Sequence, residues 1–132
     1  MLVGDPSAVD FAARDVFGLL LQYPDTDGTI TDFGDLSARA SEAGVVVIAA
    51  TDLLALTMLK PPGDYGADIV CGEIQPLGMH MQAGGGQGGF IATGDDMRYV
   101  AEFKDLMFGI TETVVEGEYG FGEVLFERTS YG

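Results

Sequence analysis

The segment Leu59–Gly94 reads LKPPGDYGADIVCGEIQPLGMHMQAGGGQGGFIATG, and the rest of the chain is organised around it. Two short apolar runs, Ile69–Cys71 and Phe90–Ala92, predict buried strands that bracket a stretch rich in Gly, Gln and Met. A glycine-rich loop between buried strands lets the backbone approach a ligand or a neighbouring chain closely. The segment therefore predicts part of a sheet together with a candidate binding loop.

Two longer apolar runs before this segment predict further strands. Val16–Tyr23 ends at a Pro-Asp-Thr-Asp-Gly turn, and Val45–Ala50 precedes the polar pair Thr51-Asp52. Neither run alternates between apolar and polar residues. We therefore expect both strands to be buried on both faces of a sheet.

The residues between these two runs predict a helix that ends at about Ala43. Its apolar residues recur at three- and four-residue spacing, at Phe33, Leu36, Ala40 and Ala43. Thr31 or Asp32 can cap its start, and Gly44 stands where a C-terminal glycine cap belongs. A strand–helix–strand unit implies parallel strands joined by a right-handed crossover, so the predicted fold class is α/β.

The C-terminal third predicts a short helix and a hairpin. The helix is expected from Asp95 toward Phe103, and the hairpin strands are Phe108–Val115 and Glu123–Phe126, joined by the loop Glu116–Gly120. Without an internal repeat or linker, residues 1–132 are expected to form a single domain. The chain stops without a terminating helix, as a truncated domain does.

The composition limits the classes of function. Six basic and 21 acidic residues give a formal net charge of −15, and this negative field argues against nucleic acid and anionic membranes as partners. Cys71 is the only cysteine, and the N-terminus resembles no signal peptide. We therefore expect a soluble cytoplasmic protein.

Asp52 and the glycine run Gly84–Gly89 each have a functional and a structural interpretation. Asp52 follows the strand ending at Ala50, where open α/β sheets bind ligands, but it can equally cap a helix over Leu53–Leu59. The glycine run can form an anion-binding nest, yet it lacks the lysine of a P-loop and precedes a strand, which favours a flexible loop or tight backbone packing.

The sulfur- and imidazole-bearing residues give weaker signals. Met79 and Met81 flank His80 and could hold a soft metal, but a chain with a single histidine argues against a metal site. His80 is expected in a loop or interface, and Cys71 as a buried structural thiol. The acidic residues Glu112, Glu116 and Glu118 are expected to form a solvated face; no feature selects a catalytic pair among the acids.

Several motifs in order resemble the P-protein of the glycine cleavage system, glycine dehydrogenase (decarboxylating). They are QYPDTDG at 22–28, ATDLLAL at 50–56, LKPPGDYGADIV at 59–70 and GEIQPLG at 72–78. The stretch 109–132 is similar to the first-subunit branch of that family. The resemblance implies a partial three-layer, mostly parallel sheet of the aspartate-aminotransferase-like (fold type I) large domain. It also implies that an N-terminal part and a C-terminal small domain are missing.

The resemblance further implies an oxidoreductase of glycine catabolism that uses pyridoxal phosphate as an electron sink and passes the aminomethyl group to the lipoyl H-protein. In the catalytic branch a lysine in an Asn-x-His-Lys turn holds the cofactor after the strand equivalent to Ile69–Cys71. The matching residues here are Gln75 and Pro76, and the two lysines, Lys60 and Lys104, lie elsewhere. The departure matches the non-catalytic first subunit, which pairs with a second subunit that carries the lysine.

The resemblance leaves a set of candidate site residues and two other functions open. Asp52 matches, across a gap, the partner of the pyridine nitrogen, and the glycine-rich loop is expected to approach the partner subunit's site. The candidate cofactor-binding residues are Asp52, Gln75, His80, Gly84, Gly85 and Gly86. Truncation should expose apolar edges that are normally covered, so the fragment is expected to form a homo-oligomer. The alternatives are a self-associating or protein-binding module and a small-molecule binder that uses the loop and Asp52.

Overall fold

The computed structural model of the protein describes residues 1, 3–12, 15–78, 80, 88–100, 102 and 107–124. It divides the chain into two compact units, unit 1 (Met1–Gly94) and unit 2 (Asp95–Gly132), and each is described by itself. The single domain expected over 1–132 stays a prediction.

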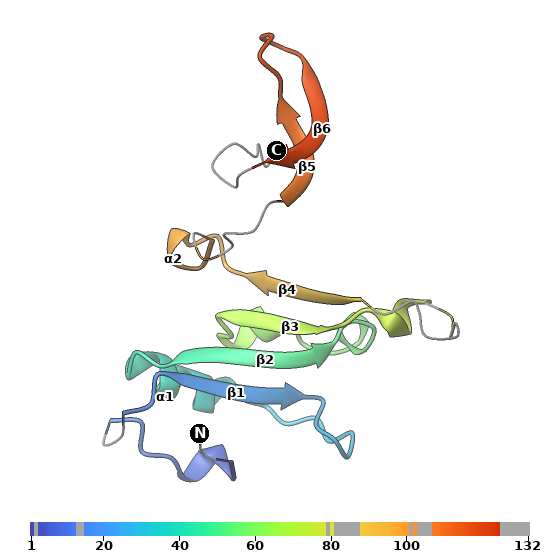
Figure 1. Ribbon diagram of the computed structural model, residues 1–132. Coiled ribbons are helices and arrows are strands. Elements are labelled where there is room, and N and C mark those ends of the chain that lie inside the picture. The colour runs from blue at the N-terminus through green and yellow to red at the C-terminus, as the bar shows by residue number, and fades with distance from the viewer. Residues whose placement is uncertain are drawn as a thin grey trace. The chain divides into compact units, whose positions relative to one another are not determined.

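Unit 1 contains a four-stranded sheet in the order β1-β2-β3-β4 (Figure 1). Its strands are β1 (Gly18–Tyr23), β2 (Val46–Asp52), β3 (Ile69–Glu73) and β4 (Gly89–Thr93). β1, β2 and β3 run parallel, and β4 pairs antiparallel with β3. The structure thus confirms the α/β class, the parallel strand–helix–strand unit and all four predicted strands of this unit.

The helix of that unit is α1 (Gly34–Glu42). Asp32 Oδ1 accepts a hydrogen bond from the Gly34 N–H at 2.9 Å, so Asp32 rather than Thr31 satisfies the first free donor of the helix. Gly44 has a φ of 73°, which confirms the predicted glycine cap, because few other residues adopt this left-handed conformation without strain.

The other helical segments of unit 1 are single 3₁₀ turns: η1 (Pro6–Ala8), η2 (Ala55–Thr57), η3 (Pro62–Tyr65) and η4 (Gln75–Leu77). The helix predicted over Leu53–Leu59 is therefore wrong. The Thr57 hydroxyl donates to the Leu54 carbonyl at 2.8 Å and Pro61 follows closely, so the segment turns once and stops. Within the described ranges, no helix is long and apolar enough to cross a membrane.

The two faces of the sheet differ in burial. The core on the covered face, where α1 packs behind β1 and β2 in Figure 1, consists of Phe11, Leu19, Leu21, Leu36, Ala40, Val45 and Val47. The opposite face, here named the open face, carries the apolar register partners Leu20, Ile48, Ala50, Ile69, Cys71 and Ile91 together with the polar residues Gln22 and Thr93.

The prediction that these strands are buried on both faces is wrong. Leu20 is 68% exposed although its neighbour Leu21 is 4% exposed, and Ile91 of the predicted buried strand β4 is 56% exposed. The other side chains of the open face at Ile48, Ile69 and Cys71 are half-buried. The described part of unit 1 covers only one side of β1, and burial therefore alternates from residue to residue along this strand.

Unit 2 contains α2 (Met97–Val100) and a two-stranded sheet of β5 (Met107–Glu112) and β6 (Tyr119–Val124). The antiparallel pairing confirms the predicted hairpin. β5 ends three residues before the predicted Val115 and β6 begins four residues before the predicted Glu123, while positions 125 and 126 lie outside the described residues. The shift arises because the Thr113 N–H already donates across to the Glu118 carbonyl, which closes the connection at those residues. The predicted helix from Asp95 toward Phe103 is observed at 97–100, and positions 101 and 103 lie outside the described residues.

Candidate functional site at the carboxyl edge of the parallel strands

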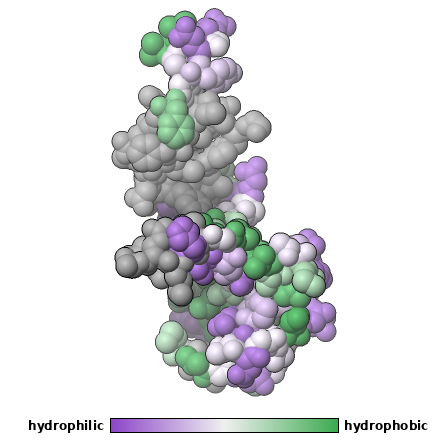
Figure 2. All heavy atoms as spheres, turned by 90° about the vertical axis from the view of Figure 1, so that its right-hand side faces the viewer, coloured by the Kyte–Doolittle hydropathy of each residue, from purple (hydrophilic) through white to green (hydrophobic). Residues whose placement is uncertain are grey.

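The parallel strands of unit 1 end at one edge of the sheet, and two carboxylates lie there side by side. Asp52 ends β2, Glu73 ends β3, and the two are register partners. The arrows of β1 and β2 point to the right in Figure 1, and Figure 2 shows the molecule from that side. Polar and apolar residues are interspersed in this view. This edge is where open α/β sheets ordinarily place ligands.

The carboxylate of Asp52 caps the turn that follows β2. Its Oδ1 accepts hydrogen bonds from the Leu54 N–H at 2.8 Å and the Ala55 N–H at 3.3 Å. The structure therefore confirms the capping interpretation, with a 3₁₀ turn in place of the predicted helix. An oxygen that already accepts two backbone hydrogen bonds has little capacity left for a ligand.

Glu73 is the residue at this edge that sequence reasoning missed. Its Oε1 accepts from the N–H groups of Ile74 and Gln75, both at 3.1 Å, and of Gly88 at 3.4 Å. The Ile74 N–H also donates to the Gly88 carbonyl at 2.9 Å. One carboxylate oxygen thus joins the end of β3 to the residue before β4. The sequence feature that could have indicated this role is a glutamate at the end of a strand, followed by a glycine-rich loop.

The remaining predicted site residues are only partly brought to this edge. Gln75 begins η4, two residues after the end of β3, and is half-buried, whereas His80 is exposed. Gly84, Gly85 and Gly86 lie outside the described residues, as do Met79 and Met81. Among the described residues, no three His, Cys, Asp or Glu side chains are grouped so that they could hold a metal ion.

An aromatic cluster lies on the covered face at the same end of the strands. The Tyr23 ring meets the Tyr65 ring edge-on at 5.4 Å between centroids and the Phe33 ring at 6.3 Å. Burial, followed by the proximity of Tyr23, raises the pKa of Tyr65 to about 12. The hydroxyls of Tyr65, Thr51 and Ser37 are buried without a hydrogen-bond partner in the described part of the chain. The cluster therefore packs unit 1, and the raised pKa of Tyr65 argues against this phenol as an acid or base near neutral pH.

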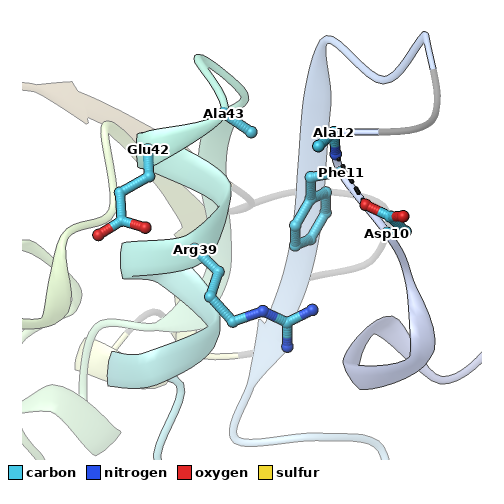
Figure 3. Close-up of a pocket in the computed structure, with 6 residues that line it drawn as sticks. All are labelled: Asp10, Phe11, Ala12, Arg39, Glu42 and Ala43. Carbon is cyan, nitrogen blue, oxygen red and sulfur yellow. Dashed lines mark hydrogen bonds between the residues drawn. The ribbon is translucent and has the colours of Figure 1, made fainter.

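A pocket of about 280 Å³ lies between the N-terminal segment and the last turn of α1 (Figure 3). It is lined by Asp10, Phe11, Ala12, Arg39, Glu42 and Ala43. Arg39 reaches across it, donates to the Val9 carbonyl at 3.0 Å and the Ser7 carbonyl at 3.4 Å, and lies 5.7 Å from the Phe11 ring centre. Because the guanidinium is used to hold the N-terminal segment, we assign this pocket a structural role.

The described residues do not fit the pyridoxal phosphate that the resemblance implies. The turn after β3 carries Pro76 at the position where the resemblance expects a Schiff-base lysine, and Lys60 is exposed in the connection between η2 and η3. The converging N–H groups of Ile74, Gln75 and Gly88, which could otherwise receive a phosphate, already hold the Glu73 carboxylate.

Comparisons with known proteins agree on one family. The sequence model described as "Glycine cleavage system P-protein" matches residues 1–125. Glycine dehydrogenase (decarboxylating) of Bdellovibrio bacteriovorus is 45% identical over 109 residues, which is 83% of this chain and 11% of that protein. The mitochondrial enzyme of Homo sapiens is 42% identical over 106 residues, 80% of this chain and 10% of that protein.

A solved structure agrees with these relatives. The crystal structure of glycine decarboxylase (P-protein) of the glycine cleavage system, in inhibitor-bound form, matches with a TM-score of 0.72 and 38% identity. The match covers 84% of this chain and 25% of that chain. The chain thus spans about a tenth of the curated relatives that it matches. On the sequence match and the shared α/β sheet, the chain belongs to the glycine cleavage system P-protein family.

Proposed function

We propose that this chain is a portion of the first, non-catalytic subunit of a two-subunit P-protein and that it does not decarboxylate glycine by itself. The observation that carries the proposal is Pro76 in the turn after β3, because proline cannot form a Schiff base. Pyridoxal phosphate would supply the electron sink in the whole enzyme, from a second subunit that carries the lysine. The lipoyl H-protein would receive the aminomethyl group.

The lengths of the relatives support a two-subunit enzyme. The match covers 25% of the crystallised glycine decarboxylase chain, whereas a stretch of similar length covers 11% of the Bdellovibrio bacteriovorus protein. The crystallised chain is therefore less than half as long, as expected where the two halves of the enzyme are separate polypeptides. The present chain would belong to the half that lacks the cofactor lysine.

Cofactor titration tests the proposal directly. The 132-residue chain is incubated with pyridoxal phosphate, reduced with borohydride and analysed by peptide mass spectrometry. We expect weak, non-saturating labelling of Lys60 and Lys104, similar to that of a lysine on an unrelated protein. A stoichiometric adduct at one lysine, lost in Lys60→Arg or in Lys104→Arg, would show that the chain binds the cofactor by itself and would refute the proposal.

A second candidate function, self-association, is favoured by the open face. Leu20 is 68% and Ile91 56% exposed on a face that also carries Ile48 and Ile69, and exposed apolar side chains grouped in this way commonly mark interfaces. A homo-oligomer would bury this face against a second copy. The small-molecule binder has less support, because Asp52 Oδ1 already accepts two backbone hydrogen bonds.

Sedimentation velocity over a concentration series tests self-association. We expect the wild-type chain to form a dimer and the Leu20→Gln/Ile91→Gln variant to remain monomeric, because both substitutions place an amide on the open face. Phe17→Gln is the matched control, since Phe17 is also exposed but precedes β1. A double variant that dimerises as the wild type does would rule this face out as the interface.

We also place the protein in the cytoplasm. The single cysteine suits a reducing compartment, and the Bdellovibrio bacteriovorus relative is bacterial. The Homo sapiens and Arabidopsis thaliana relatives are named as mitochondrial, which makes the mitochondrial matrix the competing location.

A further inference from the structure

The connection between β5 and β6 carries apolar side chains where the fold does not require them. Turns of this kind ordinarily use Gly, Asn, Asp or Pro, but this one contains Val114, which is fully exposed, and Val115, which is about half exposed. The turn is formed by the backbone: the Glu118 N–H donates to the Val115 carbonyl at 3.1 Å, and Gly117 has a φ of 81°. The two valine side chains are therefore not needed to make the turn.

Two aromatic residues on β6, the strand that follows this turn, are also largely exposed. Tyr119 and Phe121 are 62% and 76% exposed, and as alternate residues of one strand they lie on the same face. We name Val114, Val115, Tyr119 and Phe121 the hairpin patch. A two-stranded sheet is marginally stable in water, so a patch of this kind gains from being covered.

Within residues 107–124, the charged side chains of the hairpin are all acidic. Glu112, Glu116 and Glu118 are exposed, and residues 107–124 contain a further acid at Glu123 but no Lys, Arg or His. We infer that the hairpin patch is a docking surface for a partner protein whose contact region has an apolar centre and a basic rim. Charge complementarity selects this partner, since like charges placed opposite each other oppose association.

A second copy of the chain fits the hairpin patch poorly. A two-fold contact through the patch would bring Glu116 and Glu118 of one copy close to the same glutamates of the other. The inference concerns unit 2 alone and does not depend on the proposed role in glycine decarboxylation.

The sheet also offers a means of binding. β5 and β6 form a two-stranded sheet, so in the described part of unit 2 each strand has one edge without a neighbouring strand. An extended segment of the partner could pair with such an edge while its apolar residues cover the hairpin patch. A short peptide that alternates Val and Lys has both the strand propensity and the charge that this contact needs.

Fluorescence anisotropy tests the inference with that peptide, labelled with fluorescein, and with a peptide of equal length that alternates Val and Glu. We expect the Val–Lys peptide to bind the full chain saturably at physiological salt and the Val–Glu peptide not to bind. Tyr119→Ser/Phe121→Ser and Glu116→Lys/Glu118→Lys should each raise Kd by about tenfold or more. Val114→Ser/Val115→Ser should also weaken binding, and because it lies outside both strands it leaves their pairing intact.

Matched control variants separate docking from general attraction to an acidic protein. Asp27→Lys/Glu42→Lys changes the net charge by the same amount in unit 1, and Phe17→Ser/Met58→Ser removes apolar side chains that are also largely exposed there. Both controls should change Kd by less than about twofold. An equal loss of binding in the charge control, or no saturable binding to the wild type, would overturn the inference. A dimer that Val114→Ser/Val115→Ser abolishes would overturn it in favour of a second copy.

Discussion

The covered face and the open face of the sheet in unit 1 share the leucines of one strand, β1, but have different surroundings. Leu19 and Leu21 of β1 pack on the core with Leu36 and Ala40 of α1, while Leu20, between them in sequence, faces the other way and is largely exposed. The hydrophobicity of a strand therefore indicates which of its side chains could be buried. Which of them are buried depends on the elements that pack on each side of the sheet.

The largest effect is expected from a change that breaks the sheet shared by both faces. A Cβ at Gly72 would overlap the main-chain oxygen of Thr51 in β2 and lie 3.0 Å from the Phe90 ring. Because a neighbouring backbone cannot yield as a side chain can, Gly72→Ala should destabilise unit 1 by about 4 kcal/mol or more. Urea unfolding, monitored by far-UV circular dichroism, measures this loss of stability. Gly63→Ala, with open space around its Cβ, is the control, and equal losses in both variants would contradict the prediction.

A pair of neighbouring leucines compares the two faces directly. Leu21→Ala should lower the free energy of unfolding by about 3 kcal/mol, because it leaves a cavity on the covered face. Leu20→Ala removes the same atoms from the open face. It should change the free energy of unfolding by less than about 0.5 kcal/mol at a protein concentration where the chain is monomeric. If the two variants lose similar stability, the open face is covered in solution.

The smallest effect at neutral pH is expected at the end of the covered face, at Tyr65. Its pKa is raised from 10.0 to about 12, mainly because burial disfavours the phenolate. The unfolded chain therefore releases this proton first, so stability is retained below about pH 10 and falls as the pH rises toward about 12. Tyr65→Phe should remove this part of the alkaline loss and, since the hydroxyl has no partner among the described residues, cost little at pH 7.

Unfolding free energies measured between pH 8 and pH 12, in steps, check this prediction for Tyr65. Tyr119→Phe is the control, because the Tyr119 ring is largely exposed. A Tyr65→Phe variant with the same alkaline slope as the wild type would show that another group is responsible.

The parts of the fold that depend on local chemistry could be predicted from the sequence. The spacing of Leu36 and Ala40 indicated α1, Gly44 marked its end, and Asp52 was expected to cap the chain after β2. These features are set by residues close together in the sequence. The exposure of Leu20 could not be predicted, because it depends on which faces other elements cover.

The candidate site was predictable only to the level of the sheet edge. The position of Asp52 and Gln75 at the carboxyl ends of β2 and β3 follows from parallel pairing. The role of Glu73 does not, since one of its partners, Gly88, lies 15 residues further along the chain and reaches it only through the β3–β4 register. The assignment of roles to Gly84, Gly85 and Gly86 stays a prediction.

The Glu73 carboxylate also has a consequence for how this family can vary in length. By joining the backbone of Ile74 and Gln75 to that of Gly88, it fixes the distance between the two points where the connecting segment leaves and re-enters the sheet. Residues added between fixed end points cost only loop-closure entropy, about 0.6 kcal/mol for each doubling of length. Evolution could therefore lengthen or shorten this segment, and change what it contacts, while the pairing of β3 with β4 is inherited unchanged.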